Sequence, residues 1–175
     1  LMALVAVLTV AVGVKAALAA GVVLAAGLLL QRTARPHWAE VGRLPGTEVF
    51  RNVKRFAVET LPGVLVIRVD ESLLFTNSRW LSETLGAIPG QRPELRHVVL
   101  MMSGVNDIDF TGLEGLMQLA RDLKSHGVQL HLSELKGPVS DRLEAAGLST
   151  WLTGRVFRTQ FDAHQTLGAS PRPAS

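Results

Sequence analysis

The first 31 residues constrain this chain more than any other feature of its sequence. They carry one charged side chain, Lys15, and they end at a stretch that contains several arginines, QRTARPHWAEVGR. About 20 consecutive apolar residues are enough for a helix to span a bilayer. We therefore predict that residues 1–31 form a transmembrane helical segment. Positively charged flanks favour the cytoplasmic side, so Arg32, Arg35 and Arg43 are expected there.

Two arrangements of this segment are open, a single span and a short hairpin. A single helix through all of it would be about 45 Å long, more than a hydrocarbon core of about 30 Å requires, and would bury Lys15 near the midplane. Two short helices meeting around Gly13 would instead place Lys15 near a turn. We favour the hairpin. A signal peptide is disfavoured because the apolar run is too long and has no basic start. Since this run begins at Leu1, we expect the C-terminal part of a longer protein.

From Leu44 onward, short apolar runs alternate with amphipathic stretches, which predicts an α/β domain with helices packed on a mixed sheet. Asn77 is expected to cap the first helix, and Pro89 and Gly90 to stop it. The predicted strands are 64–69, 73–75, 97–102 and 128–132, and the predicted helices are 78–88, 111–127 and 138–147, with one or two more turns within 155–167. The domain is predicted to cover 44–167, after a basic junction at 32–43 and before a disordered tail at 168–175.

Four stretches of this sequence are informative together: RPHWAEVGRLPGTEVFRNVKR, PGVLVIRVDESLLFTNSRWL, LRHVVLMMSGVNDIDFTGLEGL and VQLHLSELKGPVSDRLEAAGL. In this order they resemble the C-terminal end of sulfate permease (SulP) family anion transporters. The resemblance implies the last membrane helices of a secondary active transporter, followed by a cytoplasmic STAS domain that serves regulation, folding or dimerisation. It also implies a location in the inner (plasma) membrane. The implied partners are membrane lipid, the missing transport core, a second copy of the full-length transporter and a regulatory protein at the STAS domain.

The loop between residues 103 and 112 is the candidate functional site of the predicted domain. Anti-sigma-factor antagonists, which also have STAS domains, carry a phosphorylated serine in a DSSG sequence at the equivalent place. In this chain the matching letters are Asp109, Phe110, Thr111 and Gly112. The resemblance therefore marks Ser103, Asp107, Asp109 and Gly112 as loop residues. It also suggests an alternative function, a membrane-tethered signalling module that is switched by phosphorylation.

Thr111 has two candidate roles. It stands at the acceptor position of the DSSG pattern, where a phosphate would lie on the N–H groups of a helix start. It also stands three residues before Glu114, which is the spacing of a capping box. We favour capping, with phosphorylation as an addition to it. The phenylalanine in place of the first serine departs from the pattern of the sigma-factor switch.

No other residues suggest an enzyme, a cofactor or a metal site. His37, His97, His126, His131 and His164 are scattered without the spacing of metal ligands. Asp107 and Asp109 are better interpreted as turn formers than as an acid and base pair. Phosphate-binding glycine loops and a nucleophile elbow are missing, and nothing in the sequence requires a nucleotide. The formal net charge of +3 is dispersed, which argues against nucleic acid as a partner.

Overall fold

The computed structural model describes residues 13–33 and 37–169, which fall into two compact units, Leu1–Arg35 and Pro36–Ser175. The first unit contains helix α2 (Val14–Thr33), which follows Gly13 with its φ of 92°. The first half of the predicted hairpin, residues 1–12, lies outside the described residues. Within residues 13–33 and 37–169, no helix combines the length and the apolar character that crossing a membrane requires. The transmembrane segment therefore stays a prediction.

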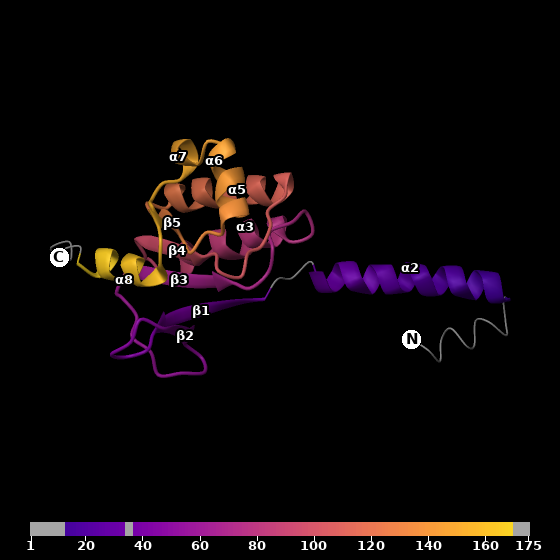
Figure 1. Cartoon of the computed structure of the whole chain (residues 1–175), viewed down its shortest axis with the longest axis horizontal. Coiled ribbons are helices and arrows are strands. Elements are labelled where there is room, and N and C mark those ends of the chain that lie inside the picture. The colour runs from indigo at the N-terminus through magenta and orange to yellow at the C-terminus, as the bar shows by residue number, and fades with distance from the viewer. Residues whose placement is uncertain (1–12, 34–36, 170–175) are drawn as a thin grey trace. The chain divides into compact units, whose positions relative to one another are not determined.

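The second unit is built on a six-stranded mixed sheet with the order β2-β1-β3-β4-β5-β6 (Figure 1). Strands β3 to β6 are parallel, and β1 is antiparallel to both of its neighbours. The predicted mixed α/β sheet is confirmed. The strands are β1 (Trp38–Arg43), β2 (Phe50–Asn52), β3 (Val64–Val69), β4 (His97–Met101), β5 (Gln129–Ser133) and β6 (Val156–Phe157).

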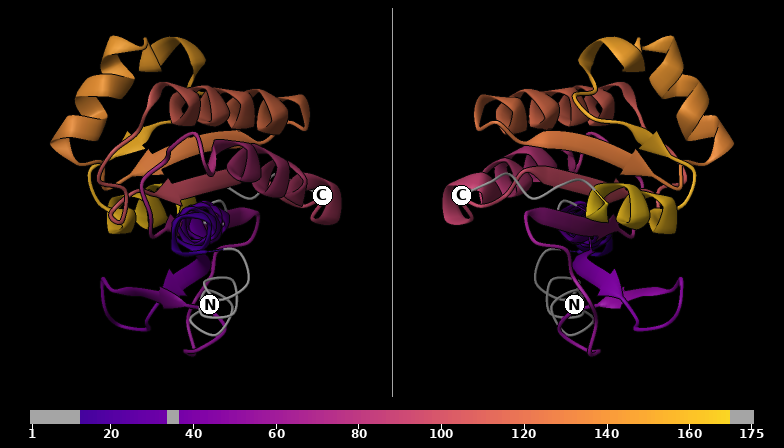
Figure 2. Two further views of the ribbon diagram at one scale, coloured as in Figure 1. Left: turned by 90° about the vertical axis from the view of Figure 1, so that its right-hand side faces the viewer. Right: turned by 90° about the vertical axis from the view of Figure 1, so that its left-hand side faces the viewer.

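The two faces of the sheet are covered by different helices (Figure 2). Leucines of α3, α5, α6 and α7 pack on one face together with Ile67 and Leu100, and α8 packs on the other with Val66 and Val99. Because β3 and β4 are covered on both sides, both consist almost wholly of apolar residues. The helices are α3 (Ser78–Gly86), α4 (Ile88–Gln91), α5 (Phe110–Ser125), α6 (Gly137–Ala145), α7 (Leu148–Trp151) and α8 (Gln160–Gly168).

One predicted strand, Leu73–Phe75, is wrong. Leu73 forms only an isolated bridge to Ile108. The reason is the side chain of Asn77, whose Oδ1 accepts from the Leu74 N–H at 2.9 Å and whose Nδ2 donates to the Ser72 carbonyl at 2.9 Å. These bonds turn the chain before a strand can extend. They also occupy the Asn77 side chain, which therefore makes no capping bond to α3.

Three predicted boundaries also differ from the structure. Residues 38–43 of the predicted junction form β1, where Ala39 and Val41 are buried, so the α/β unit begins before Leu44. The proline and glycine predicted to stop the first helix lie inside the short helix α4, because proline is tolerated in a first turn. Gly168, the first residue of the predicted tail, is the last residue of α8, and residues 170–175 lie outside the described residues.

Candidate functional site

The candidate loop lies at the carboxyl edge of the parallel strands, where open α/β sheets commonly bind their ligands. It leaves β4 after Met101 and enters α5 at Phe110. The loop is pressed against the end of β3, because a Cβ atom on Gly104 would lie 2.5 Å from the Val69 carbonyl oxygen. Only glycine fits at this position. Ser103, beside it, is half-buried and makes no side-chain hydrogen bond within the described part of the chain.

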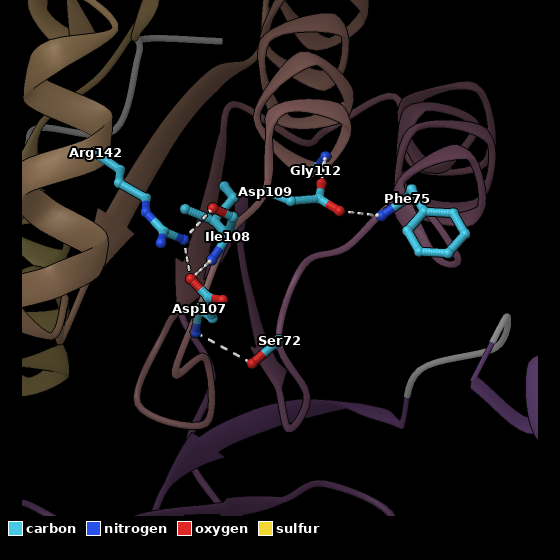
Figure 3. Close-up of polar contacts among 7 residues, drawn as sticks. All are labelled: Ser72, Phe75, Asp107, Ile108, Asp109, Gly112 and Arg142. Atoms are coloured by element: carbon cyan, nitrogen blue, oxygen red, sulfur yellow. Dashed lines mark hydrogen bonds and ion pairs between the residues drawn. The ribbon is translucent and has the colours of Figure 1, made fainter.

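Asp109 joins the start of α5 to the segment that precedes α3 (Figure 3). Its Oδ1 accepts from the Gly112 N–H at 2.7 Å, which makes it the N-cap of α5. Its Oδ2 accepts from the Phe75 N–H at 2.8 Å, and its own N–H donates to the Leu73 carbonyl at 3.1 Å. A single carboxylate therefore holds two segments that lie more than thirty residues apart in the sequence.

The prediction that Thr111 caps this helix is wrong. An N-cap residue has an extended backbone, and Asp109 has it, with φ −88° and ψ 179°. Thr111 already lies inside the helix, and its side chain is exposed. Neither Thr111 nor Glu114 makes a side-chain hydrogen bond within the described residues, so the capping box does not form. The Thr111 hydroxyl is left accessible.

Asp107 points away from Asp109, towards α6 (Figure 3). Its Oδ1 accepts from the Arg142 guanidinium and, at 2.9 Å, from the Ile108 N–H. Its backbone N–H donates to Ser72 Oγ at 3.1 Å. The carboxylates of the two aspartates therefore bind different segments and do not form an acid and base pair. The contribution of Arg142 carries no sequence signal, because it comes from a separate helix 35 positions along the chain.

Gly112 has no side chain and therefore allows α5 to pack closely against the segment that contains Leu73. It is buried, and a Cβ atom there would lie 2.1 Å from the Leu73 carbonyl oxygen and 2.6 Å from the Leu73 carbonyl carbon. Both are backbone atoms, which cannot move aside as a flexible side chain can. The glycine of the DSSG-like sequence is therefore needed for packing.

A second polar cluster fixes the start of β1 against the end of β3. His37 Nδ1 lies 2.8 Å from Asp70 Oδ2, and Arg68 Nε donates to Asp70 Oδ1 at 2.5 Å. Burial raises the pKa of Asp70, but the hydrogen bonds from Arg68 and His37 outweigh it and hold this pKa below its usual value. Asp70 therefore stays an anion that binds both neighbours.

The outer faces of α3 and α5 form a groove of about 540 Å³ beside the loop. The apolar side of the groove comes from Phe110, Leu113 and Met117, which follow one another at helical spacing. Phe110 is 73% exposed, and Phe75 on the adjoining segment is 66% exposed. The remaining lining residues are mainly polar: Ser78, Arg79, Ser82, Thr111, Glu114, Gly115, Gln118 and Arg121. Within the described residues, no three potential metal ligands gather here or elsewhere.

Comparison with protein families assigns most of this unit. The family model of the STAS domain matches residues 55–163. The chain belongs to the STAS domain family.

The chain also matches the C-terminal STAS region of sulfate transporters. High affinity sulfate transporter 2 of Stylosanthes hamata is 36% identical over 154 residues, which cover 82% of this chain and 23% of the relative. Sulfate transporter 1.3 of Arabidopsis thaliana is 35% identical over 149 residues, or 79% of this chain and 23% of the relative. The chain thus spans less than a quarter of the length of these relatives.

Solved structures share the fold of the STAS domain. The murine Solute Carrier 26 family member A9 anion transporter, in its inward-facing state, matches with a TM-score of 0.82 at 20% identity, over 96% of this chain and 28% of that protein. An anti-sigma factor antagonist of Thermotoga maritima matches with a TM-score of 0.54 at 16% identity, over 62% of this chain and 90% of that protein. At these identities the likeness shows the fold alone.

Within this STAS domain, the predicted loop residues divide by what they contact. Asp107, Asp109 and Gly112 hold the loop to neighbouring segments, and Thr111 is exposed at its end. The residues missed from the sequence are their partners: Ser72, Phe75 and Arg142. The same region thus combines a tightly held backbone with an exposed hydroxyl and exposed aromatic rings.

Proposed function

We propose that this chain is the C-terminal part of a sulfate-type secondary active anion transporter, and that its STAS domain regulates the transporter. The observation that carries the proposal is the identity of 36% to a high affinity sulfate transporter over 154 residues. This aligned length exceeds the span from residue 55 to residue 163 that the STAS model covers, so the similarity extends beyond the matched domain.

We assign residues 1–31 to the terminal membrane segment of the transport core in the inner (plasma) membrane, with the STAS domain in the cytoplasm. The support is compositional, since Lys15 is the single charge in this segment and arginines follow it. Transport requires a substrate site between repeats near the bilayer midplane. The chain alone is therefore expected not to transport.

We assign the regulatory contact to the loop and the groove between α3 and α5. Exposed aromatic side chains are enriched at protein interfaces, and Phe75 and Phe110 are the most exposed large apolar side chains of the described part of the α/β unit. The partner is either another part of the transporter, including a second copy, or a separate regulatory protein. The tight hydrogen bonding of the loop by Asp107 and Asp109 supports a preformed contact surface.

A signalling switch is the second candidate, and the accessible Thr111 hydroxyl is the observation that favours it. Thr111 lies in the first turn of the 16-residue helix α5, where backbone N–H groups favour a phosphate. Stoichiometric phosphate on Thr111 in protein isolated from its native cells, together with a co-purifying kinase, would favour the switch over the transporter.

The test is a chimera in which this chain replaces the matching C-terminal region of the Stylosanthes transporter. The chimera, produced in host cells that lack sulfate uptake, is expected to restore uptake of radiolabelled sulfate. Replacing Phe110 and Met117 by serine is expected to reduce uptake at unchanged membrane abundance. The matched control is Phe56→Ser, which changes an exposed phenylalanine away from the groove and is expected to have no effect.

Two results would contradict the proposal. A chimera that reaches the membrane in normal amounts, folds and still takes up no sulfate would remove the assignment to this transporter class. Sulfate uptake by the 175-residue chain alone, reconstituted in liposomes, would contradict its role as a part without transport activity.

A further inference from the structure

Two histidines that are 34 positions apart in the sequence meet on the face of the sheet that α8 covers. His97 Nδ1 on β4 lies 3.1 Å from His131 Nε2 on β5. The His131 ring is buried, with an exposed fraction of 2%, and contacts the Phe157 ring at a centroid distance of 5.6 Å. The interpretation of the five histidines as scattered is therefore wrong for this pair.

The hydrogen bonds around His131 fix the positions of the protons. The Arg155 N–H donates to His131 Nδ1 at 3.0 Å, so this nitrogen carries a lone pair. In a neutral imidazole the other nitrogen then carries the proton. His131 Nε2 therefore donates to His97 Nδ1, and His97 carries its own proton on Nε2. A metal ion between the rings is disfavoured, because His131 Nε2 is already protonated.

Neither histidine can accept a further proton without breaking one of these hydrogen bonds. On His97 Nδ1 it would meet the Nε2–H of His131, and on His131 Nδ1 it would meet the Arg155 N–H. Either position costs one hydrogen bond. Burial, followed by the charges of His97 and Arg155, lowers the pKa of His131 to about 4, and burial also lowers the pKa of His97.

Several other titratable or charged side chains on this side of the sheet have partners of their own. His164, on α8, packs edge-on against the Phe50 ring, and its pKa is lowered by burial and by Arg43. Their partners are Glu59 for Arg43, Asp70 for Arg68, the Gln160 N–H for Glu134 and the Thr159 N–H for Asp162.

The histidine pair lies directly against the segment that carries β6 and α8. The Gly154 N–H donates to the Leu130 carbonyl at 2.9 Å, and the Leu132 N–H donates to the Arg155 carbonyl at 3.0 Å. A Cβ atom on Gly154 would lie 2.5 Å from His131 Nδ1, so the ring is wedged against this backbone. The strand that follows, β6, has only two residues, and few other backbone bonds hold it to the sheet.

We propose that the His97–His131 pair is an acid-sensitive switch, which loosens β6 and α8 from the sheet when it gains a proton. The charge gained by His131 would face the Arg155 N–H and the Arg155 guanidinium, and both would repel it. The loosened part is the C-terminal end of the domain, on the face opposite to α5. The switch is independent of the anion that a transporter would carry.

The test is hydrogen exchange of the full chain, measured at about pH 8 and about pH 5 and corrected for the intrinsic effect of pH on exchange. Exchange in residues 155–168 is expected to rise several-fold at the lower pH, while α5 changes little. His131→Gln keeps a donor and an acceptor without titrating, and is expected to abolish the rise. His126→Gln is the matched control, because His126 is exposed at the end of α5, and should behave as the unmodified chain does.

A second measurement does not depend on how the variants fold. Nitrogen-15 chemical shifts of the unmodified chain near neutral pH are expected to report His131 protonated on Nε2 and His97 protonated on Nε2. An equal rise of exchange in the unmodified chain and in His131→Gln would overturn the proposal, and so would a proton on His131 Nδ1. If His131→Gln fails to fold, His97→Gln, at a half-buried site, together with the chemical shifts decides the question.

Discussion

One face of the sheet is covered by α3, α5, α6 and α7, whereas α8 is the helix that packs on the other (Figure 2). The first face is filled by large apolar side chains such as Leu100, Leu116 and Leu132, all fully buried. On the second face, strand β5 and helix α8 themselves bury polar side chains, His131, Ser133 and Gln160. Ser133 Oγ donates to Gln160 Oε1 at 2.6 Å, and Gln160 Nε2 is buried without a partner in the described structure.

The two faces of this small domain therefore differ in how their contribution to stability depends on pH. Apolar burial scales with area and does not depend on pH. Buried polar groups cost free energy unless their hydrogen bonds are complete, so the α8 face depends on the protonation of its histidines. The candidate loop enters α5 and therefore rests on the face whose core does not titrate.

The largest expected effect is on the apolar face. Leu100→Ala is expected to lower the free energy of unfolding by about 2 to 5 kcal/mol, because it removes buried carbons and leaves a cavity. Val98→Ala and Val99→Ala are the matched pair, since these neighbours on β4 face opposite sides. Val98→Ala is expected to lower the free energy of unfolding more than Val99→Ala does.

The measurement uses tryptophan fluorescence. All three tryptophans, Trp38, Trp80 and Trp151, lie in the α/β unit, so their fluorescence in denaturant measures this unit within the full chain. Equal costs for the two valines would remove the distinction between the faces.

The second expected effect is a pH dependence that arises on the α8 face. His131 has a pKa of about 4 in the folded state against 6.5 as its ordinary value, so the unfolded state binds more protons between these values. Stability is then complete above the ordinary value and decreases as the pH falls towards the folded pKa. A displacement of this size corresponds to about 3 kcal/mol. Denaturant midpoints across this pH range are expected to fall for the unmodified chain and to fall much less for His131→Gln. Parallel curves would contradict the assignment to His131.

The smallest expected effect concerns the candidate loop. Asp109→Ala is expected to cost about 0.5 to 2 kcal/mol, because α5 loses its cap and Phe75 loses its hydrogen-bond acceptor. Thr111→Ala is expected to change stability by less than about 0.5 kcal/mol, since the Thr111 side chain is exposed and makes no hydrogen bond within the described residues. Tryptophan fluorescence in denaturant checks both variants. A larger cost for Thr111→Ala than for Asp109→Ala would restore the threonine as the cap.

The central elements of this fold are readable from sequence because both faces of the sheet are covered. That arrangement makes β3 and β4 continuous apolar runs, which stand out in a chain of mixed composition. Strand β1 was missed because its sequence, WAEVGR, alternates polar and apolar residues and continues a basic stretch. Its position is set by pairing with β3, a tertiary contact without a local signal.

The candidate site was predictable only as a region. The DSSG-like sequence located the loop, but the spacing between Thr111 and Glu114 indicated the wrong residue as the cap. The extended backbone of Asp109 makes that residue the cap. The meeting of His97 and His131 depends on the register of β4 against β5, in which Val99 lies opposite His131. Register follows from the packing of the whole sheet, so no spacing within the sequence reveals it.

The hydrogen bonds of Asp109 affect the entropy cost of binding a partner at the candidate loop. Its carboxylate bonds to the backbone of Phe75, and Phe110 is the next residue in the chain, so the backbones that carry these two exposed aromatic side chains are fixed to a single group. A partner that binds both rings has little backbone left to order, and the entropy cost of its association is reduced accordingly. This preorganisation depends on one carboxylate, whose loss would weaken such a partner's affinity even though Asp109 need not touch it.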